Sequence, residues 1–345
     1  EVVFEIYTYG SGCLRINGEE VKRFRNTHGG RSLDYTLQVK AGVPYDIELD
    51  FEYFRSDAQL NFDIGFKQKV NIDASVACVK EADVVVFAGG ISPLLEGEEM
   101  GVNLPGFKGG DRTDIELPAV QRELIHALHR AGKKIILVNC SGSPIALEPE
   151  TKNCEAILQA WYPGQAGGTA VADVLFGDYN PGGRLPVTFY RNMSQLPDFE
   201  DYNMTGRTYR YMTQQPLFPF GYGLSYTTFE YGNLSLAKEQ IKVGEPLKLT
   251  VNVTNNGQRD GEEVVQVYLK KQDDAEGPGK TLRAFKRVHI PAGKSVEVAF
   301  DLNGKELEWW DAQSNTMRVC AGRYDVMVGK SSQDRDLQRW SFVIE

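Results

Sequence analysis

The feature that most constrains the fold is a pair of short, uninterrupted apolar runs at residues 84–87 and 135–138. Runs of this length, rich in valine and isoleucine, are typical of strands buried on both faces of a parallel sheet. A third run covers residues 156–158, and a helical pattern over residues 170–176 ends at Gly177. The alternation of strands and helices predicts a parallel α/β sheet.

The segment between the first two runs has helical spacing. Its apolar residues recur every three or four positions and define one face, made of Val120, Leu124, Leu128 and Ala131. Pro118 suits the first turn of this helix, and Gly132 suits its C-terminal cap. The order strand, helix, strand agrees with the α/β assignment.

Regions of alternating apolar and polar residues flank the α/β segment. Residues 1–67 contain several such runs and a turn signal at Asn17-Gly18, which together predict a sandwich-like β-module. The α/β part is expected over residues 70–232, and its last forty or so residues are irregular and rich in aromatic side chains. Alternation then resumes in five runs, at residues 247–253, 265–269, 296–302, 324–328 and 340–344. Residues 233–345 therefore predict a second β-sandwich of about 100 residues, the size of an immunoglobulin domain.

Composition narrows the class of protein. The 345 residues are enough for two or three domains, each with its own core. No apolar run approaches the roughly 20 residues of a membrane-spanning helix. The sequence therefore predicts no membrane span. Lys and Arg number 38 against 47 Asp and Glu, so the formal net charge is −9, and the basic residues form no block. Nucleic-acid binding needs a basic surface, so the sequence predicts no nucleic-acid partner either.

The five cysteines are scattered, without a C-x-x-C pair or a metal-ligand spacing. They are Cys13, Cys78, Cys140, Cys154 and Cys320. An odd, dispersed set favours buried packing over a disulfide framework or a zinc site. The chain also begins with Glu rather than Met and opens within an apolar pattern. We therefore expect that residue 1 is not the natural start of the protein.

A glycine-rich loop follows the first apolar run and carries three carboxylates, Glu96, Glu98 and Glu99. Open α/β sheets bind ligands at the carboxyl ends of their strands, where this loop must lie. Loops of about twenty residues without a pattern of their own are usually functional. Closely spaced carboxylates repel one another, which raises the pKa of at least one of them if the loop is covered. The alternative, a solvated acidic loop, remains open from the pattern alone.

Other candidate sites have less support. The glycines after residue 87 lack the G-x-G-x-x-G spacing of a dinucleotide site, and the acidic residues would repel a pyrophosphate. His126 and His129 lie three residues apart on the predicted helix, but without further ligands nearby a surface location is favoured over a metal pair. Ser141 ends a strand outside the spacing of a nucleophile elbow, so we interpret it as part of a strand-end turn.

Several motifs, in order along residues 80–230, resemble the second domain of glycoside hydrolase family 3. The matching segments are Leu-Glu-Gly-Glu-Glu-Met at 95–100, Gly-Asp-Arg at 110–112, Trp-Tyr-Pro-Gly-Gln at 161–165, Asn-Pro-Gly-Gly-Arg-Leu-Pro at 180–186, Gly-Arg-Thr-Tyr-Arg-Tyr at 206–211 and Phe-Pro-Phe-Gly-Tyr-Gly-Leu-Ser-Tyr at 218–226. The C-terminal sandwich resembles that family's fibronectin type III-like domain. Residues 1–67 resemble the later part of a protective-antigen-type β-sandwich.

The resemblance implies a retaining, exo-acting β-glycosidase with two carboxylates about 5–5.5 Å apart. In this family the nucleophile is an aspartate on an N-terminal barrel, to which nothing in this sequence corresponds. The acid/base is a glutamate on a loop of the α/β domain. It maps to the acidic loop, where Glu98 is the first choice, Glu96 the second and Glu99 the third.

Three further residues are candidates for the sugar site. Asp111 and Arg112 follow the loop, where an ion pair that holds the loop is favoured over sugar contact. Trp161 ends a strand and is expected either to border the sugar or to pack in the core. The segments at 95–100 and 161–165 most resemble the β-xylosidase branch of the family.

The predicted fold is multidomain α/β plus all-β, with a parallel α/β sandwich flanked by a partial protective-antigen-type β-sandwich and a fibronectin type III-like β-sandwich. The predicted activity is that of a β-xylosidase releasing xylose from xylo-oligosaccharides, of which this chain supplies the acid/base and is inactive alone. A β-glucosidase, a non-catalytic carbohydrate-binding or scaffold unit, and a nucleotide-binding protein are the alternatives.

The expected partners are an oligosaccharide substrate and the barrel of the same enzyme, and homodimer formation is left open. No metal or organic cofactor is implied. A periplasmic or extracellular location follows from where such enzymes meet their substrates.

Overall fold

The computed structural model describes residues 1–25, 31–53, 59–98 and 100–345. The chain divides into two compact units. The first unit comprises residues 1–142 and 149–161, and the second comprises residues 143–148 and 162–345.

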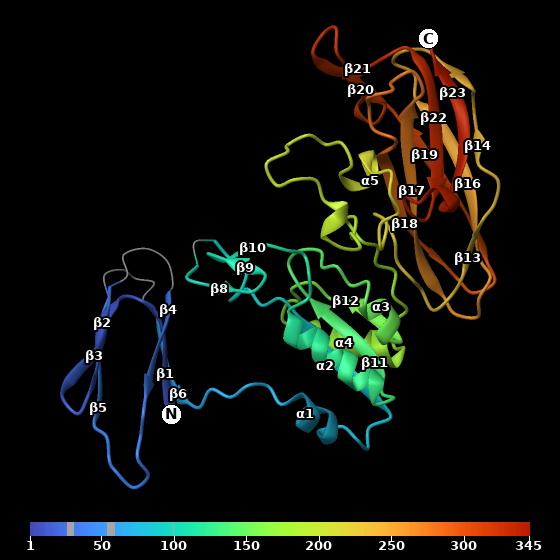
Figure 1. The fold of residues 1–345 in the computed structure, drawn as a ribbon. Helices are drawn as coiled ribbons and strands as arrows, with labels where there is room; N and C mark the ends of the chain where they lie inside the picture. Colours follow the sequence, from blue (N-terminus) through green and yellow to red (C-terminus); the bar gives the residue numbers. More distant parts are fainter. Residues whose placement is uncertain (26–30, 54–58, 99) are drawn as a thin grey trace. The chain divides into compact units, whose positions relative to one another are not determined.

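The first unit begins with two three-stranded antiparallel sheets, in the orders β4-β1-β6 and β3-β2-β5 (Figure 1). Their strands are β1 (Val2–Tyr9), β2 (Ser11–Ile16), β3 (Glu19–Phe24), β4 (Arg31–Leu37), β5 (Ile47–Glu52) and β6 (Gln59–Gly65). Apolar side chains of β1, β2 and β3 form a small core around Phe4, Leu14 and Phe24. The predicted turn joins β2 to β3 with positive φ at Asn17 and Gly18, +53° and +80°. A two-residue hairpin turn of type I′ requires this conformation.

A three-stranded parallel sheet follows in the same unit, in the order β12-β11-β7. Its strands are β7 (Val84–Gly90), β11 (Lys134–Cys140) and β12 (Ala156–Gln159). The register pairs Val86 with Ile136 and Ile136 with Ala156. In the central strand, the neighbouring residues Leu137 and Val138 point to opposite faces and are 0% and 4% exposed, so both faces are covered there, although Ile136 is only half-buried. The three apolar runs are thus strands of one parallel sheet, as the sequence predicted.

Helix α2 (Ala119–Arg130) joins β7 to β11 and packs on both strands. It begins directly after Pro118 and is followed by Gly132 in the left-handed conformation, with φ of +75°, so both predicted end signals are confirmed. Two shorter helices, α1 (Ile72–Cys78) and α3 (Glu150–Asn153), pack against α2.

Two predictions about burial were wrong. Val120 and Ala131, expected on the buried face of α2, are exposed, Val120 at 45%, whereas Leu128 of that face is buried as predicted, together with Ile125. Strand β7 is not buried on both faces either, since Val84 and Val86 are 45% and 51% exposed. β7 is an edge strand of its sheet. Helix α2 packs on β7, but on the face opposite to Val84 and Val86.

The second unit starts with helix α4 (Gly167–Phe176), which ends at Gly177 in the left-handed conformation, as predicted. The aromatic-rich connector after it is mostly irregular, with short helices at Met193–Gln195 and α5 (Thr208–Tyr211). Its rings stack on one another: Tyr209 lies 4.4 Å from Phe220, measured between ring centroids, and Phe218 lies 5.4 Å from Tyr222. These aromatic side chains therefore pack within the connector.

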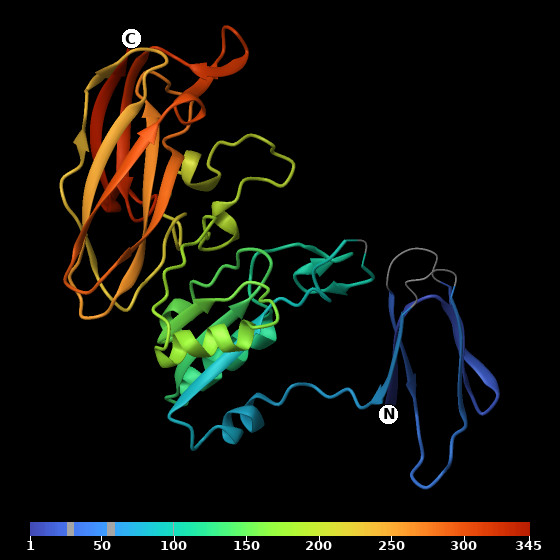
Figure 2. The same ribbon diagram turned by 180° about the vertical axis from the view of Figure 1, so that it is seen from behind.

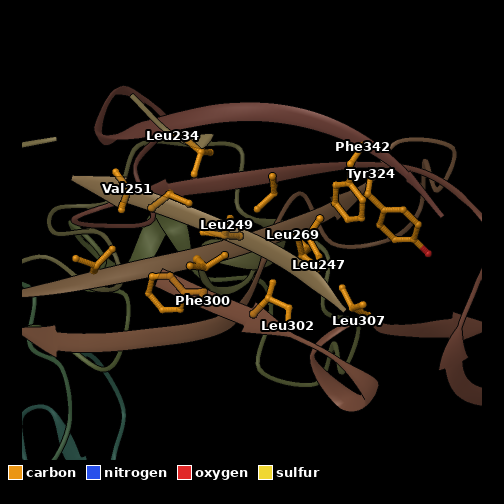
Figure 3. Close-up of a cluster of buried hydrophobic side chains, with 14 of the residues drawn as sticks. Leu234, Leu247, Leu249, Val251, Leu269, Phe300, Leu302, Leu307, Tyr324 and Phe342 are labelled. Atoms are coloured by element: carbon orange, nitrogen blue, oxygen red, sulfur yellow. The ribbon is translucent and has the colours of Figure 1, made fainter. Parts of the chain in front are cut away.

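A β-sandwich completes the second unit (Figure 2). One sheet has the order β13-β16-β14, with β19 also paired to β16, and the other has the order β15-β23-β22-β17-β18. The strands are β13 (Phe229–Tyr231), β14 (Ser235–Leu236), β15 (Gln240–Ile241), β16 (Leu247–Asn255), β17 (Gly261–Lys271), β18 (Thr281–Ile290), β19 (Ser295–Leu302), β22 (Gly322–Gly329) and β23 (Leu337–Ile344). Figure 3 shows the core between the sheets, to which Leu249, Phe300 and Tyr324 contribute buried side chains.

The five strands expected in this sandwich are all present, as β16, β17, β19, β22 and β23. The sequence did not predict the short strands β13, β14 and β15, strand β18, or a hairpin made of β20 (Glu308–Asp311) and β21 (Thr316–Val319).

The five cysteines are free thiols. Cys13 is buried, but Cys78 is exposed, so the expected packing role is wrong for Cys78. It ends α1, a helix with no buried residue. None of the helices among the described residues is long and apolar enough to cross a bilayer.

Candidate active site

The carboxyl ends of β7, β11 and β12 lie at one edge of the parallel sheet, because the three strands pair in register there. Gly90 is opposite Cys140, and Asn139 is opposite Gln159. The Ile91 amide donates a hydrogen bond of 2.9 Å to the Cys140 carbonyl, which extends the pairing past the end of β7. The acidic loop therefore leaves the sheet at the edge where α/β proteins bind ligands.

The loop that leaves β7 is closed at its base by glycines. The Gly97 amide donates to the Gly110 carbonyl at 3.1 Å, and the Met100 amide donates to the Gly109 carbonyl at 3.0 Å. Gly110 has φ of +89°, and a Cβ there would lie 1.9 Å from the Gly97 carbonyl oxygen. Only glycine permits this contact, which brings together two chain segments thirteen residues apart in sequence.

The tip of the loop has more order than the sequence suggested. It forms a small antiparallel sheet of β8 (Asn103–Leu104), β9 (Phe107–Lys108) and β10 (Asp111–Arg112) (Figure 1). Phe107 is 6% exposed and anchors this sheet, and the Gly109 amide donates to the Val102 carbonyl at 2.7 Å. The loop is thus a small three-stranded sheet on a glycine base.

The predicted carboxylates lie beside this base. Glu96 is half-buried, and its amide donates to the Ser92 carbonyl at 3.3 Å. Glu98 is exposed and directly follows Gly97, the residue at the closed base. Glu99 lies outside the described residues. A carboxyl group held at the closed base with its side chain open to solvent can exchange a proton with a bound ligand.

Asp111 and Arg112 form β10, on the returning side of the loop. Asp111 is exposed and Arg112 is half-buried. The Arg112 guanidinium donates through Nε to the Asp114 carbonyl at 3.1 Å, so its side chain is fixed to the backbone that leads toward α2. This contact agrees with a role in holding the loop, and the Asp111–Arg112 ion pair stays a prediction.

Trp161 follows β12 and is half-buried. Its backbone has φ of +58°, a conformation that costs energy in a residue with a Cβ. The preceding residue is tied to the sheet, because the Ala160 amide donates to the Asn139 carbonyl at 2.9 Å. The structure thus places Trp161 at the same sheet edge as the acidic loop, and its contact with sugar stays a prediction.

Sequence reasoning missed two polar features of this edge. Asn139 donates through Nδ2 to Gln159 Oε1 at 2.6 Å and to Ser141 Oγ at 3.2 Å, which cross-links β11 and β12. The Gln121 amide on α2 donates to the Gly90 carbonyl and accepts from the Gly90 amide, both at 2.8 Å. Uncharged amides inside a helix or strand carry no motif that would have marked them. Ser141 is buried within the first cluster, in keeping with a strand-end role.

The other candidate sites receive no support from the geometry. His126 and His129 are both exposed on α2. Within the described ranges, no three His, Cys, Asp or Glu side chains gather as metal ligands would.

A parallel sheet with an acidic, glycine-closed loop at its carboxyl edge, followed by a β-sandwich, defines the class to which this chain belongs. The sequence model of the glycosyl hydrolase family 3 C-terminal domain matches residues 14–226, and that of the fibronectin type III-like domain matches residues 263–332. The chain therefore belongs to glycoside hydrolase family 3, as a C-terminal part of such a protein.

Individual relatives agree with this assignment. A xylan 1,4-β-xylosidase of Xylanibacter ruminicola is 49% identical over all of this chain, which covers 40% of that relative. A β-xylosidase of Formosa agariphila is 37% identical over 82% of this chain and 38% of its own length. The chain thus spans about two fifths of the length of these curated relatives.

Among solved structures, the β-glucosidase of Kluyveromyces marxianus in complex with glucose matches with a TM-score of 0.77 and 27% identity, over all of this chain and 43% of that one. A β-glucosidase from Erythrobacter marinus matches with a TM-score of 0.69 and 36% identity, over 79% of this chain and 36% of that one.

Proposed function

We propose that this chain is the C-terminal part of a retaining, exo-acting β-glycosidase, and that the complete enzyme is a β-xylosidase that releases xylose from the non-reducing end of xylo-oligosaccharides. The observation that carries the proposal is the acidic loop at the carboxyl edge of the parallel sheet. The 49% identity to a protein named xylan 1,4-β-xylosidase, over the whole chain, supports xylose as the sugar.

In this proposal the loop supplies the general acid/base. Glu98 is the favoured residue, since it follows the glycine base and presents an exposed side chain, with Glu96 second and Glu99 third. A general acid must hold its proton at the working pH, which burial and nearby negative charge favour. In the complete enzyme, a bound sugar together with the barrel would supply the burial.

The second carboxylate, the nucleophile, would come from an N-terminal barrel outside this chain. Retaining enzymes place the two carboxyl groups about 5–5.5 Å apart, on opposite sides of the anomeric carbon. The nucleophile attacks that carbon while the acid protonates the leaving oxygen. The group that acted as the acid, now a carboxylate, then acts as the base that activates the water that releases the sugar. Neither step needs a metal or organic cofactor.

The test is Glu98→Ala in the complete enzyme. We expect kcat/KM for xylobiose, which has a poor leaving group, to fall about 10²–10⁴-fold, because proton transfer contributes on that scale. Activity on an activated aryl β-xyloside should fall far less, and added azide should partly restore turnover. Glu123→Ala, at an exposed carboxylate on α2, is the matched control and should be fully active. Full activity of Glu98→Ala on xylobiose would exclude Glu98 and move the assignment to Glu96.

A β-glucosidase is the second candidate, because several relatives and the matching solved structures carry that name. Comparing kcat/KM for aryl β-xyloside and aryl β-glucoside in the complete enzyme separates the two. The same assay on residues 1–345 alone should show no hydrolysis. Activity there would contradict the need for the barrel, and sugar binding without activity in the complete enzyme would favour a carbohydrate-binding unit.

The remaining expectations belong to the same proposal. Residues 1–67 would be part of a protective-antigen-type sandwich, and the enzyme would act in the periplasm or outside the cell. Fractionation of producing cells, with the activity followed in each fraction, tests the location.

A further inference from the structure

We infer that Gln121 is a positioning residue for the acidic loop: its carboxamide holds the end of β7 and so fixes the direction in which the loop with Glu96 and Glu98 leaves the sheet. The inference rests on the proposed function of that loop. It concerns a helix residue with no predicted role in the reaction.

The contact is a reciprocal pair of hydrogen bonds between one side chain and one peptide unit. Gln121 Nε2 donates to the Gly90 carbonyl and Gln121 Oε1 accepts from the Gly90 amide, both at 2.8 Å. A primary amide is the neutral side chain that offers a donor and an acceptor in this arrangement. Two bonds to the same residue fix its orientation as well as its position.

The backbone around the contact is shaped to admit it. A Cβ on Gly89 would lie 2.5 Å from Gln121 Oε1, so the close approach of the amide depends on glycine there. Gly90 has φ of +131°, and a Cβ on it would lie 1.9 Å from the Cys140 carbonyl oxygen. Two consecutive glycines have the largest conformational freedom of any dipeptide, so they need an external constraint to hold one direction.

That constraint comes from two sides. The Ile91 amide bonds the Cys140 carbonyl on β11 at 2.9 Å, and the Ile91 side chain is 1% exposed. Gln121 holds Gly90 from α2. Ser92 then accepts hydrogen bonds from the amides of Leu95, at 2.9 Å, and Glu96, at 3.3 Å. The segment from Gly90 to Glu96 is therefore held by hydrogen bonds at both of its ends.

Helix α2 is a firm support for this clamp. The neighbouring Arg122 binds both carboxylate oxygens of Glu150, through Nε at 2.9 Å and Nη2 at 3.2 Å, and also binds Glu116. Glu150 is fully buried, and Ile125 and Leu128 of the same helix are in the interior. The contacts of Arg122, Ile125 and Leu128 thus fix the part of the helix to which the Gln121 backbone belongs.

The consequence for the reaction is specific. Misplacing a catalytic group by about 1 Å can cost about 100-fold in rate. Loss of the clamp should therefore affect substrates that need protonation by the loop more than substrates with good leaving groups.

The first experiment is Gln121→Met in the complete enzyme, which keeps the side-chain length and removes both hydrogen bonds. We expect kcat/KM for xylobiose to fall about 10- to 100-fold relative to wild type. Activity on dinitrophenyl β-xyloside should change less than about threefold, because this leaving group needs little protonation. Glu123→Met, an exposed position on the same helix, is the control and should match wild type on both substrates. An equal fall on both substrates, or no fall, overturns the inference.

The second experiment is Gln121→Glu, which guards against a simple folding defect. When protonated, the introduced carboxyl group can donate to the Gly90 carbonyl and accept from its amide. When ionised it keeps only the acceptor and faces the carbonyl with a negative charge. The xylobiose defect relative to wild type should therefore shrink as the pH falls through the pKa of the introduced group, while the defect of Gln121→Met stays constant with pH. A defect independent of pH in both variants contradicts the positioning role.

Failure of this inference is distinguishable from failure of the proposed function. If neither Glu98→Ala nor Glu96→Ala shows a selective loss on xylobiose, the acidic loop is not the acid/base, and the positioning role is lost with it. If one of them shows that loss and Gln121→Met does not, the function stands and the inference alone is wrong.

Discussion

The fibronectin type III-like sandwich and the edge strand β7 of the parallel sheet differ in how far they bury their apolar residues. In the sandwich, the inward residues of β16, including Leu247 and Leu249, are at most 2% exposed. In the sheet, Val84 and Val86 of β7 are 45% and 51% exposed. The sandwich is therefore a self-sufficient structural element. The strand that carries the acidic loop has an apolar face that its own unit leaves open.

This difference indicates that the sandwich contributes most of the buried core, whereas the candidate catalytic carboxylates lie in the acidic loop of the other unit. The sandwich and the connector hold the large buried core and the buried pair of Arg184 and Glu263, while the acidic loop follows an edge strand that has one exposed face. Mutating each part and measuring the unfolding of the chain tests this division.

The largest effect is expected for Arg184→Met. Arg184 binds Glu263 on β17 at 3.0 Å, and the two side chains are 7% and 2% exposed. Burial raises the pKa of Glu263 even with its partner present. Removing the arginine leaves a buried carboxyl group unpaired and should cost about 3–5 kcal/mol in urea unfolding at neutral pH. Because protonation neutralises Glu263, the cost should shrink as the pH falls through its raised pKa. A loss of unfolding free energy below about 1 kcal/mol would show that this pair does not stabilise the contact between the connector and β17.

A core truncation, Leu249→Ala, should cost about 2–5 kcal/mol, since it removes buried methyl groups and leaves a cavity. Three of the four tryptophans, Trp309, Trp310 and Trp340, lie in the sandwich, so the urea transition followed by their fluorescence reports on its unfolding. A change comparable to that of an exposed substitution would contradict the self-sufficient core.

A smaller, pH-dependent effect is expected at the hairpin of β20 and β21. The hydroxyl of Ser314 and then the guanidinium of Arg318 lower the pKa of Asp311 from 3.8 to about 2. A carboxyl group with a lowered pKa in the folded state adds stability above its ordinary pKa, and this stability is lost as the pH falls from about 4 to 2. Asp311→Asn should therefore lower Tm at pH 6 and leave Tm unchanged near pH 2. Equal shifts at both pH values would refute the assignment.

The smallest effect is expected for Val86→Thr, which keeps β-branching on the exposed face of β7. Surface substitutions of this kind change stability by less than about 0.5 kcal/mol. A cost above about 1 kcal/mol in residues 1–345 would mean that this face is covered, and the contrast with the sandwich would fail. The same variant in the complete enzyme reports whether another part of the protein covers β7.

The sequence allowed prediction of the elements whose signal is carried by apolar pattern. The strands of the parallel sheet, the ends of α2 at Pro118 and Gly132, and five strands of the sandwich all follow from period and end signals. Strand β18 was missed because Arg283, Lys286 and Arg287 interrupt its apolar residues on an edge of the sheet. Edge strands often carry such charges.

The candidate site was predictable only in part. The carboxylates and glycines of the loop stand out as residue types, and the order of strands places them at the sheet edge. The bond between Gln121 and Gly90 and the positive φ of Trp161 depend on how distant segments meet. Neither leaves a local periodicity in the sequence.

The glycine base of the acidic loop has a consequence for how such a chain tolerates length changes. The bonds from the Gly97 amide to the Gly110 carbonyl and from the Gly109 amide to the Val102 carbonyl close the loop before the hairpin of β8 and β9 begins. Residues inserted beyond them lengthen a segment whose ends are already joined, and each doubling of a flexible loop costs only about 0.6 kcal/mol. We therefore expect the segment between β8 and β9 to accept insertions with the carboxylates before it left in place.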